Sequence, residues 1–443
     1  MAMNDTRSII SVRLCLATIL LSVVGLAFPD TPAAAVIPDT PAGRALELWL
    51  AAFNSGDRAR IESFDTIHAP WLTLDKAMGA RAHSGGYDLL SIEKSDRLWI
   101  IFRVRGKADL SPIRGGLVVK PDNPAVISLL SLAPAGAKSR EFPVDGAERG
   151  RLIESAGNLL DKFYVFPEAG KRMSAALRRR QKLGEYRAIA DSDIFAVRLT
   201  DDLRAVNHDK HVSVHFSPEM VPPDPPDEPT PRSQIDPVRA RQLAASNCGF
   251  EEAEHLAPNI GYLKLDQFAE PAVCAPTAIA AMNFLADSAA LIIDLRDNHG
   301  GRAEMVALVA SYLFDTPTHL DDIYDRQKST TDQTWTFPYF PGKRITGRPV
   351  FVLTSRRTFS AAEEFSYDLK SLGRVTVIGE TTGGGAHTVG PHRLDDHFYI
   401  EIPFGRIVNP ITKADWEGKG VEPDFNVPAE DALKEALRRA RSN

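Results

Sequence analysis

The second half of the chain contains a strand–helix–strand unit, and this unit most constrains the fold. Residues 350–353 and 375–378 are short apolar runs rich in β-branched residues, which is typical of buried strands. Residues 360–372 between them have helical spacing, and Gly373 stands where a glycine commonly ends a helix. The pattern therefore predicts two buried strands joined by a helix.

The same alternation continues on both sides of this unit. Further strands are expected at 260–265, 290–295 and 397–403, and further helices at 275–286, 301–314 and 432–441. Strands that alternate with helices are typical of an α/β core with a largely parallel sheet. We expect such a core over residues 241–443.

Two smaller parts are expected before the core. Residues 43–135 combine a helical segment, 43–64, with a run of strands, which predicts a small α+β domain. Its order of elements resembles the cystatin-like and nuclear-transport-factor-like (NTF2-like) folds. Residues 148–217 form a mostly helical subdomain that ends in a strand, and the proline-rich residues 218–240 form a linker. The expected strands of the first part are 87–92, 97–104, 114–120 and 125–132, and the expected helices of the second are 152–163, 169–183 and 191–206.

The N-terminal residues 1–35 have the pattern of a secretory signal peptide. Arg7 and Arg13 precede an apolar run, 14–28, and the small residues 33–35 suit a cleavage site. The apolar run is short for a membrane span, although an uncleaved anchor is the alternative. We therefore expect an exported protein, periplasmic or secreted, without a transmembrane span once the leader is removed.

The charge balance argues against a nucleic-acid partner. The chain has 52 Lys and Arg residues against 58 Asp and Glu residues, a formal net charge of −6. Nucleic-acid-binding domains carry a basic surface instead. No motif indicates a cofactor, and the oligomeric state is left open.

Two cysteines, Cys248 and Cys274, lie outside the leader. In an oxidising compartment these two residues could form a disulfide with a stabilising role. Two unpaired thiols are the alternative.

Ser360 lies where a strand-to-helix connection enters its helix. The first turn of a helix offers free N–H groups and a positive dipole end, and these suit a nucleophile whose substrate develops an oxyanion. The same residues, Ser360 to Glu363, also match a capping box, in which the serine only begins the helix. Both interpretations stay open on this stretch alone.

A glycine-rich loop follows the strand expected at 290–295. Gly300 and Gly301 allow close backbone approach and expose N–H groups, which could bind an oxyanion or a phosphate. A tight turn is the alternative, and the spacing of a dinucleotide-binding loop is missing.

Taken together, several segments resemble the carboxyl-terminal processing (tail-specific) peptidases and the tricorn core, a serine peptidase family that includes the interphotoreceptor retinoid-binding-protein modules. They are IGYLKLDQF at 260, ALIIDLRDNHGG at 290, RPVFVLTSRRTFSAAEEF at 348, VIGETTGGGAHT at 377 and WEGKGVEPDFNV at 416, with a looser match of NHDKHVSVHF at 207. The resemblance covers residues 148 onwards in the family's order. It implies a crotonase-like (ClpP-like) core with Ser360 as nucleophile and the N–H groups of Ala361, Gly300 and Gly301 around the oxyanion. The chain leaves no room for the PDZ domain that many members carry.

The general base departs from the ordinary members of that family. Their lysine would fall on Gly385, and no lysine stands within 376–408. The resemblance to the tricorn branch implies His211 as base and Glu417 as the carboxylate that orients it. His387 is the rival base, and His299 is expected to contact substrate or to cap the oxyanion loop. His208, His211 and His215 do not have the spacing of a helical zinc motif, so we expect no metal.

These observations predict an exported serine endopeptidase that cleaves peptides or unfolded proteins through an acyl-enzyme on Ser360. A second hypothesis is a non-catalytic binding protein for apolar small molecules or peptides, which the loss of the lysine favours. A third is an esterase that uses the same serine on small acyl substrates. Because a serine without a base is a poor nucleophile at neutral pH, the choice depends on which residue faces Ser360.

Overall fold

A computed structural model describes residues 35–72, 74–134, 142–223 and 237–442. The expected leader, apart from residue 35, and most of the expected linker at 218–240 lie outside the described residues. None of the helices within the described ranges is long and apolar enough to cross a bilayer.

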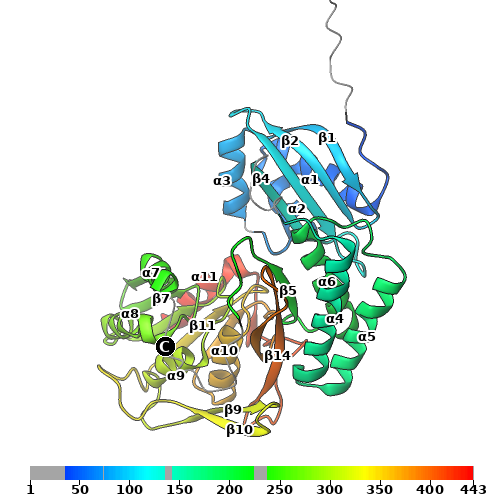
Figure 1. Cartoon of the computed structure of the whole chain (residues 1–443). Helices are drawn as coiled ribbons and strands as arrows, with labels where there is room; N and C mark the ends of the chain where they lie inside the picture. Colours follow the sequence, from blue (N-terminus) through cyan, green and yellow to red (C-terminus); the bar gives the residue numbers. More distant parts are fainter. Residues whose placement is uncertain (1–34, 73, 135–141, 224–236, 443) are drawn as a thin grey trace, which may run out of the picture.

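The N-terminal part consists of three helices on one face of a four-stranded antiparallel sheet (Figure 1). The helices are α1 (Pro41–Ser55), α2 (Arg58–His68) and α3 (Leu74–Ser84), and the strands are β1 (Tyr87–Ser95), β2 (Trp99–Gly106), β3 (Pro112–Val119) and β4 (Ile127–Pro134). The single helix expected at 43–64 is wrong. Gly56 adopts a left-handed conformation that ends α1, and the side chain of Asp57 then caps α2.

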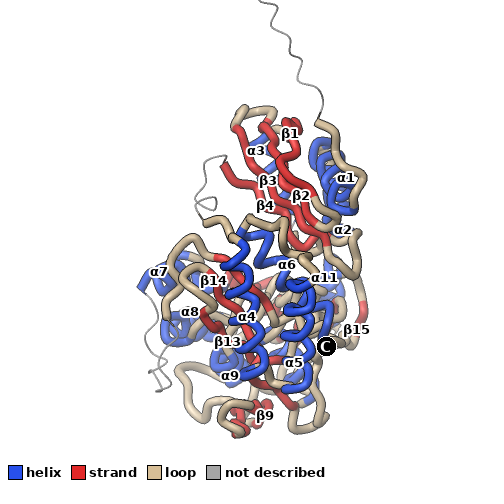
Figure 2. The backbone as a smooth tube through the Cα atoms, turned by 45° about the vertical axis from the view of Figure 1, so that its right-hand side comes forward, coloured by secondary structure: helices blue, strands red, loops and turns tan. Residues whose placement is uncertain are grey.

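The next three helices connect this sheet to the rest of the molecule. They are α4 (Gly146–Phe163), α5 (Pro167–Lys182) and α6 (Ser192–Asn207), close to the expected ranges. Figure 2 shows them below the N-terminal sheet, and their buried residues share one apolar cluster with strand residues such as Trp99 and Phe398. Arg114 of β3 also pairs with Asp191 at 2.7 Å. The N-terminal sheet is therefore covered by α1–α3 on one face and by α6 on the other.

The core is a six-stranded sheet in the order β15-β12-β11-β8-β7-β6, parallel except for β6. Its strands are β6 (Phe250–Leu256), β7 (Ile260–Leu265), β8 (Ala290–Asp294), β11 (Val350–Thr354), β12 (Thr376–Gly379) and β15 (Phe425–Asn426). Helices α8 (Pro271–Phe284), α9 (Ala303–Ser311) and α10 (Ala361–Ser371) cover one face, α11 (Ala429–Ala440) covers the other, and α7 (Pro237–Ala245) lies beside α8. The expected α/β class with a parallel sheet is confirmed.

A second, antiparallel sheet lies beside the core. Its order is β10-β9-β14-β13, and β5 also pairs with β14. The strands are β5 (Ser213–Phe216), β9 (His319–Asp325), β10 (Thr330–Trp335), β13 (His387–Arg393) and β14 (Phe398–Val408). The strand expected at 397–403 is present, but it joins this sheet and not the parallel one. The β5–β14 pairing places segments from distant parts of the chain side by side.

Cys248 and Cys274 form a disulfide. Both residues are buried, and they join the segment before β6 to helix α8. The pairing is the one expected from the sequence, and its place in the apolar cluster indicates a structural role.

Candidate active site

Ser360 lies at the junction between the loop after β11 and the first residue of α10. Its backbone has φ 55° and ψ −122°, a conformation that non-glycine residues rarely adopt. Such a strained strand-to-helix turn presents a side chain at the carboxyl end of a parallel sheet, as nucleophilic serines are presented in α/β hydrolases. Ser360 also begins the helix, so the two interpretations of this serine are compatible.

His211 faces Ser360 across the boundary between the two sheets. Its Nε2 atom lies 3.2 Å from the Oγ atom of Ser360. The backbone N–H of His211 donates to Oδ1 of Asp209 at 2.9 Å, and its ring packs on Phe359 with centroids 4.8 Å apart. Burial lowers the pKa of His211 to about 4. The imidazole is therefore neutral at pH 7 and can accept a proton.

Gly385, where the family resemblance would place a lysine, lies against this imidazole. A Cβ atom at Gly385 would come within 2.6 Å of Cε1 of His211 and within 2.3 Å of Cζ of Phe359. Any side chain at residue 385 would thus compete with the histidine for one space. The absence of a side chain at Gly385 therefore leaves the space that the imidazole of His211 occupies.

The loop that contains Gly385 is fixed by Glu363 of α10. This buried carboxylate accepts hydrogen bonds from the N–H groups of Ser360, Gly384 and Gly385 at 2.9, 2.6 and 2.8 Å. The hydroxyl of Thr382 donates to it as well, at 2.5 Å. The sequence marked Glu363 only as a partner in a capping box, and its contacts with residues 382–385 could not be predicted from spacing.

A second histidine, His387, is paired with other groups. Its Nδ1 atom lies 2.8 Å from Oδ2 of Asp209. The same oxygen accepts a hydrogen bond from the hydroxyl group of Tyr164 at 2.7 Å. Burial opposes a charge on His387, but the hydrogen bond with Asp209 and the negative charges of Asp209, Glu417 and Asp415 together outweigh it and raise the pKa of His387. No hydrogen bond joins His387 to Ser360 among the described residues. The structure thus places His211, and not His387, against the serine.

Glu417 lies close to both histidines without a hydrogen bond to His211. Its Oε2 atom accepts the N–H of Ala386 at 2.6 Å and lies 3.6 Å from Nδ1 of His387. Burial raises the pKa of Glu417 to about 7. Nδ1 of His211 is buried and has no hydrogen-bond partner within the described residues. The expected orienting contact is therefore not formed in this structure.

The expected oxyanion donors fall into two groups. The N–H of Gly300 donates to Oδ1 of Asn298 at 2.8 Å, so this donor has another partner. Within the described residues, the N–H groups of Gly301 and Ala361 donate no hydrogen bond to another group of the protein. Gly300 still matters sterically, because a Cβ atom there would lie 2.7 Å from Cβ of Ser360. His299 is exposed, and within the described part of the chain no hydrogen bond joins it to Ser360.

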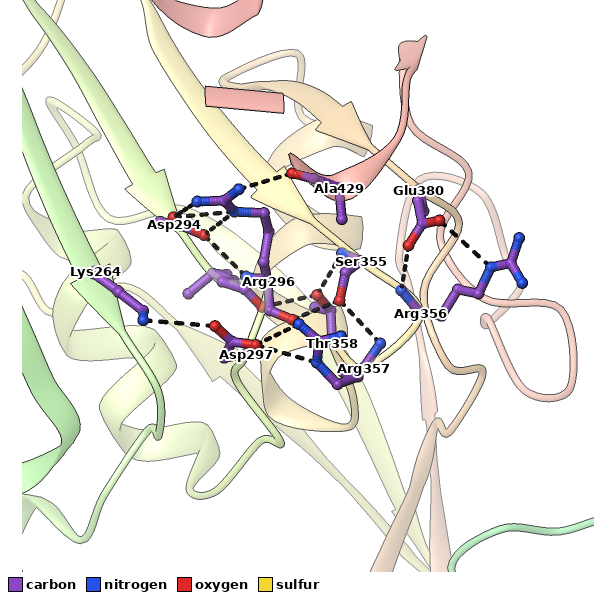
Figure 3. A network of polar contacts seen from close by, with 11 residues as sticks. Lys264, Asp294, Arg296, Asp297, Ser355, Arg356, Arg357, Thr358, Glu380 and Ala429 are labelled. Atoms are coloured by element: carbon purple, nitrogen blue, oxygen red, sulfur yellow. Dashed lines mark hydrogen bonds and ion pairs between the residues drawn. The ribbon is translucent and has the colours of Figure 1, made fainter. Parts of the chain in front are cut away.

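A polar network ties the glycine loop to the loop before Ser360 (Figure 3). Asp297 accepts two hydrogen bonds from Arg357, at 3.1 and 2.6 Å, and Ser355 donates to the carbonyl of Arg296 at 2.5 Å. Lys264, at the end of β7, lies 3.5 Å from Asp297. The network therefore fixes the carboxyl ends of neighbouring parallel strands, where ligands bind in open α/β sheets.

Two groups of side chains have atoms close enough to share a metal ion. Asp209, His211 and Glu417 form the first group. Its two carboxylates already accept hydrogen bonds from donors of the protein itself, as described above. The second group consists of three buried acids, Asp321, Glu364 and Asp368, on β9 and α10.

Two family models match this chain. Residues 259–427 match peptidase family S41, and residues 147–245 match the N-terminal domain of peptidase S41 in eukaryotic IRBP. The chain therefore contains a peptidase S41 domain, preceded by a domain of the type that precedes it in eukaryotic IRBP.

Its relatives include carboxyl-terminal processing enzymes. The chain is 29% identical over 193 residues to carboxyl-terminal-processing peptidase 1, chloroplastic, of Arabidopsis thaliana, which is 43% of this chain and 38% of the relative. It is 27% identical over 173 residues to the carboxyl-terminal-processing protease of Picosynechococcus sp., which is 39% of this chain and 40% of that protein. The chain thus spans about two fifths of the length of these curated relatives.

The chain also has partial similarity to solved structures. A putative peptidase from Parabacteroides merdae has a TM-score of 0.46 and 20% identity over 66% of this chain and 96% of its own. The photosystem II D1 C-terminal processing protease has a TM-score of 0.39 and 17% identity over the same shares, 66% and 96%.

Proposed function

We propose that this protein is a serine endopeptidase in which Ser360 is the nucleophile and His211 the general base. The observation that carries the proposal is the 3.2 Å contact between Oγ of Ser360 and Nε2 of a histidine that burial keeps neutral. A base within hydrogen-bond reach and in its deprotonated form is what a serine needs to attack a carbonyl.

The proposed reaction has two halves. The Oγ atom of Ser360 attacks the scissile carbonyl carbon while its proton passes to Nε2 of His211. The N–H groups of Ala361 and Gly301 stabilise the oxyanion. His211 then donates the proton to the leaving amine, which departs and leaves an acyl-enzyme. Water, deprotonated by His211, cleaves the ester and restores the serine.

Two carboxylates compete for the role of assisting His211. Glu417 remains our prediction for this role, because one of its oxygens lies within 4.8 Å of a ring nitrogen of His211. Asp209 is the competing group, since it binds the backbone N–H of His211 and its charge raises the pKa of that histidine. A greater loss of kcat in Glu417→Gln than in Asp209→Asn would support Glu417. The opposite result would assign the role to Asp209.

The proposal also covers location and domain organisation. A disulfide is stable in oxidising compartments, so the Cys248–Cys274 bond supports export through a leader at 1–35. We propose an α+β accessory domain at 43–135, a helical subdomain at 148–217 and a crotonase-like peptidase core at 241–443. The substrate class, unfolded protein or peptide, is proposed by analogy with the carboxyl-terminal processing relatives.

The test is digestion of casein, an unstructured protein, by the purified protein and two serine variants. We expect cleavage by the native protein and by Ser366→Ala, in which a hydroxyl of the same helix that bonds to the carbonyl of Ala362 is removed. Ser360→Ala should show no cleavage. If Ser360→Ala cleaves as fast as the native protein, Ser360 is not the nucleophile. Absence of cleavage by all three across pH 5–9 would favour the alternative of an apolar-ligand-binding protein.

A further inference from the structure

The N-terminal part contains a cavity lined by residues of its three helices and of strand β4. The cavity has a volume of about 140 Å³. Its walls are mainly apolar and include Trp49, Phe53, Phe64 and Leu130. An apolar cavity of about this size accommodates one benzene ring. It lies outside the candidate active site and has no part in the proposed peptidase mechanism.

One acidic side chain, Asp65 of α2, lines this apolar cavity. Asp65 is 5% exposed, and its Oδ2 atom has no hydrogen-bond partner among the described residues. Burial raises the pKa of Asp65 to about 6. A buried carboxyl without a partner destabilises a folded protein, since it has lost its hydration without gaining a hydrogen bond. A ligand that donates a hydrogen bond to this carboxyl would remove that penalty.

No basic side chain of the described residues compensates Asp65. Lys76 also lines the cavity, but no ion pair joins it to Asp65, and the pKa of Asp65 is raised by burial. The combination of aromatic walls with one uncompensated acid favours a cation over an anion. Aromatic faces attract an ammonium group as well.

Some of the residues that line the cavity are exposed to solvent, and Trp71 is one of them. This residue lines the cavity and is 46% exposed, and its indole N–H donates to the carbonyl of Ile127 at 2.8 Å. A ligand can therefore enter along an indole that the sheet holds in place. Because Trp71 and Trp49 both line the cavity, occupancy should change the tryptophan fluorescence of the protein.

We propose that this cavity binds a small amine: one aromatic or alicyclic ring with a protonated nitrogen that pairs with Asp65. The ring fills the apolar space and the ammonium group donates to the buried carboxylate. The chemical class of the ligand follows from three features of the cavity: its volume, its apolar and aromatic walls, and its single acidic side chain. The proposed peptidase activity is independent of it.

The test is titration of the purified full chain with benzylamine at pH 7.5, followed by tryptophan fluorescence and calorimetry. Benzyl alcohol and benzoate have the same ring with a neutral and an anionic group. We expect saturable binding of benzylamine, weaker binding of benzyl alcohol and none of benzoate. The isosteric variant Asp65→Asn should bind benzylamine about 10- to 100-fold more weakly and keep its affinity for benzyl alcohol, because a charge-assisted hydrogen bond is lost.

Two outcomes would overturn the proposal: equal affinity of native protein and Asp65→Asn for benzylamine, or no saturable binding of benzylamine at millimolar concentration. Ala77→Leu, which fills the cavity from α3, should abolish binding of both ring compounds. Retention of benzylamine binding by Ala77→Leu, when circular dichroism shows a native fold, would place the amine elsewhere. Casein cleavage by the same variants gives a separate readout, so a failure here does not count against the peptidase.

Discussion

Substitution of Gly385 by alanine tests whether the space beside His211 controls the active site. The new Cβ atom would lie 2.6 Å from Cε1 of His211 and 2.3 Å from Cζ of Phe359, whereas ordinary contacts begin at 3.4 Å. The two rings would have to withdraw by roughly 1 Å, and a misplacement of that size can lower a rate by about 10²-fold. It would also lengthen the 3.2 Å contact with Ser360 beyond hydrogen-bond range.

We therefore expect Gly385→Ala to lower kcat/KM for casein by about 10²-fold, and by up to about 10⁴-fold if the imidazole leaves its position. Labelling of Ser360 by a fluorophosphonate should slow in parallel, which separates the effect from substrate binding. Neither Gly385 nor the control position Gly383 has a positive φ, so alanine causes no backbone strain at either residue.

Gly383→Ala is the matched control for this experiment. Its Cβ atom would approach Cδ2 of Phe359 at 2.7 Å but no atom of His211. Equal losses in the two variants would mean that displacement of Phe359, and not of the base, explains the effect. Full activity of Gly385→Ala would refute the view that residue 385 and His211 share one space.

Three further predictions concern pH and stability. Burial lowers the pKa of His211 to about 4, so its neutral form is complete above about pH 5, whereas burial raises the pKa of Glu417, the proposed assisting carboxylate, to about 7. In Glu417→Gln, where residue 417 no longer titrates, kcat/KM should therefore be flat from pH 5 to 8; an inflection near 6.5 in that variant would contradict this. Removal of the disulfide by Cys248→Ser with Cys274→Ser should lower the free energy of unfolding by about 3 kcal/mol, measured by urea denaturation, and an unchanged midpoint would assign the bond no stabilising role. Burial raises the pKa of Glu364 well above its usual value, so its contribution to stability is full below about pH 4 and is lost as pH rises toward the raised pKa. Glu364→Gln should therefore unfold at a higher temperature than the native protein at pH 8 and show little difference at pH 4, and a lower melting temperature at pH 8 would be the contrary result.

The parallel core could be predicted from the sequence because its strands are buried on both faces. Such strands are continuous apolar runs, and β7 was expected at its observed residues, Ile260–Leu265. The antiparallel strands were harder to predict. β10 (Thr330–Trp335) is largely exposed and polar, so it has no apolar periodicity, and its place is set by pairing with β9.

The candidate site was also predictable only in part. Ser360 and His211 were predicted because a resemblance to a known family fixed their roles, and the structure brings them together. The partners of the charged residues could not be predicted. Asp209 and His387 are 178 positions apart, and only the folded sheets place them 2.8 Å from each other. Glu417 was expected on His211, but the local backbone directs it to the N–H of Ala386.

The pairing of β5 with β14 has a consequence for the newly made chain. His211 lies two residues before β5, and β5 is held by residues 398–401 of β14. The base can therefore reach the serine only after nearly the whole polypeptide has been synthesised and the two sheets have met. A nascent or truncated chain that ends before residue 398 would contain both reactive residues and yet be harmless to its neighbours. If the proposed peptidase activity holds, the order in which the chain emerges would thus keep unfinished chains inactive.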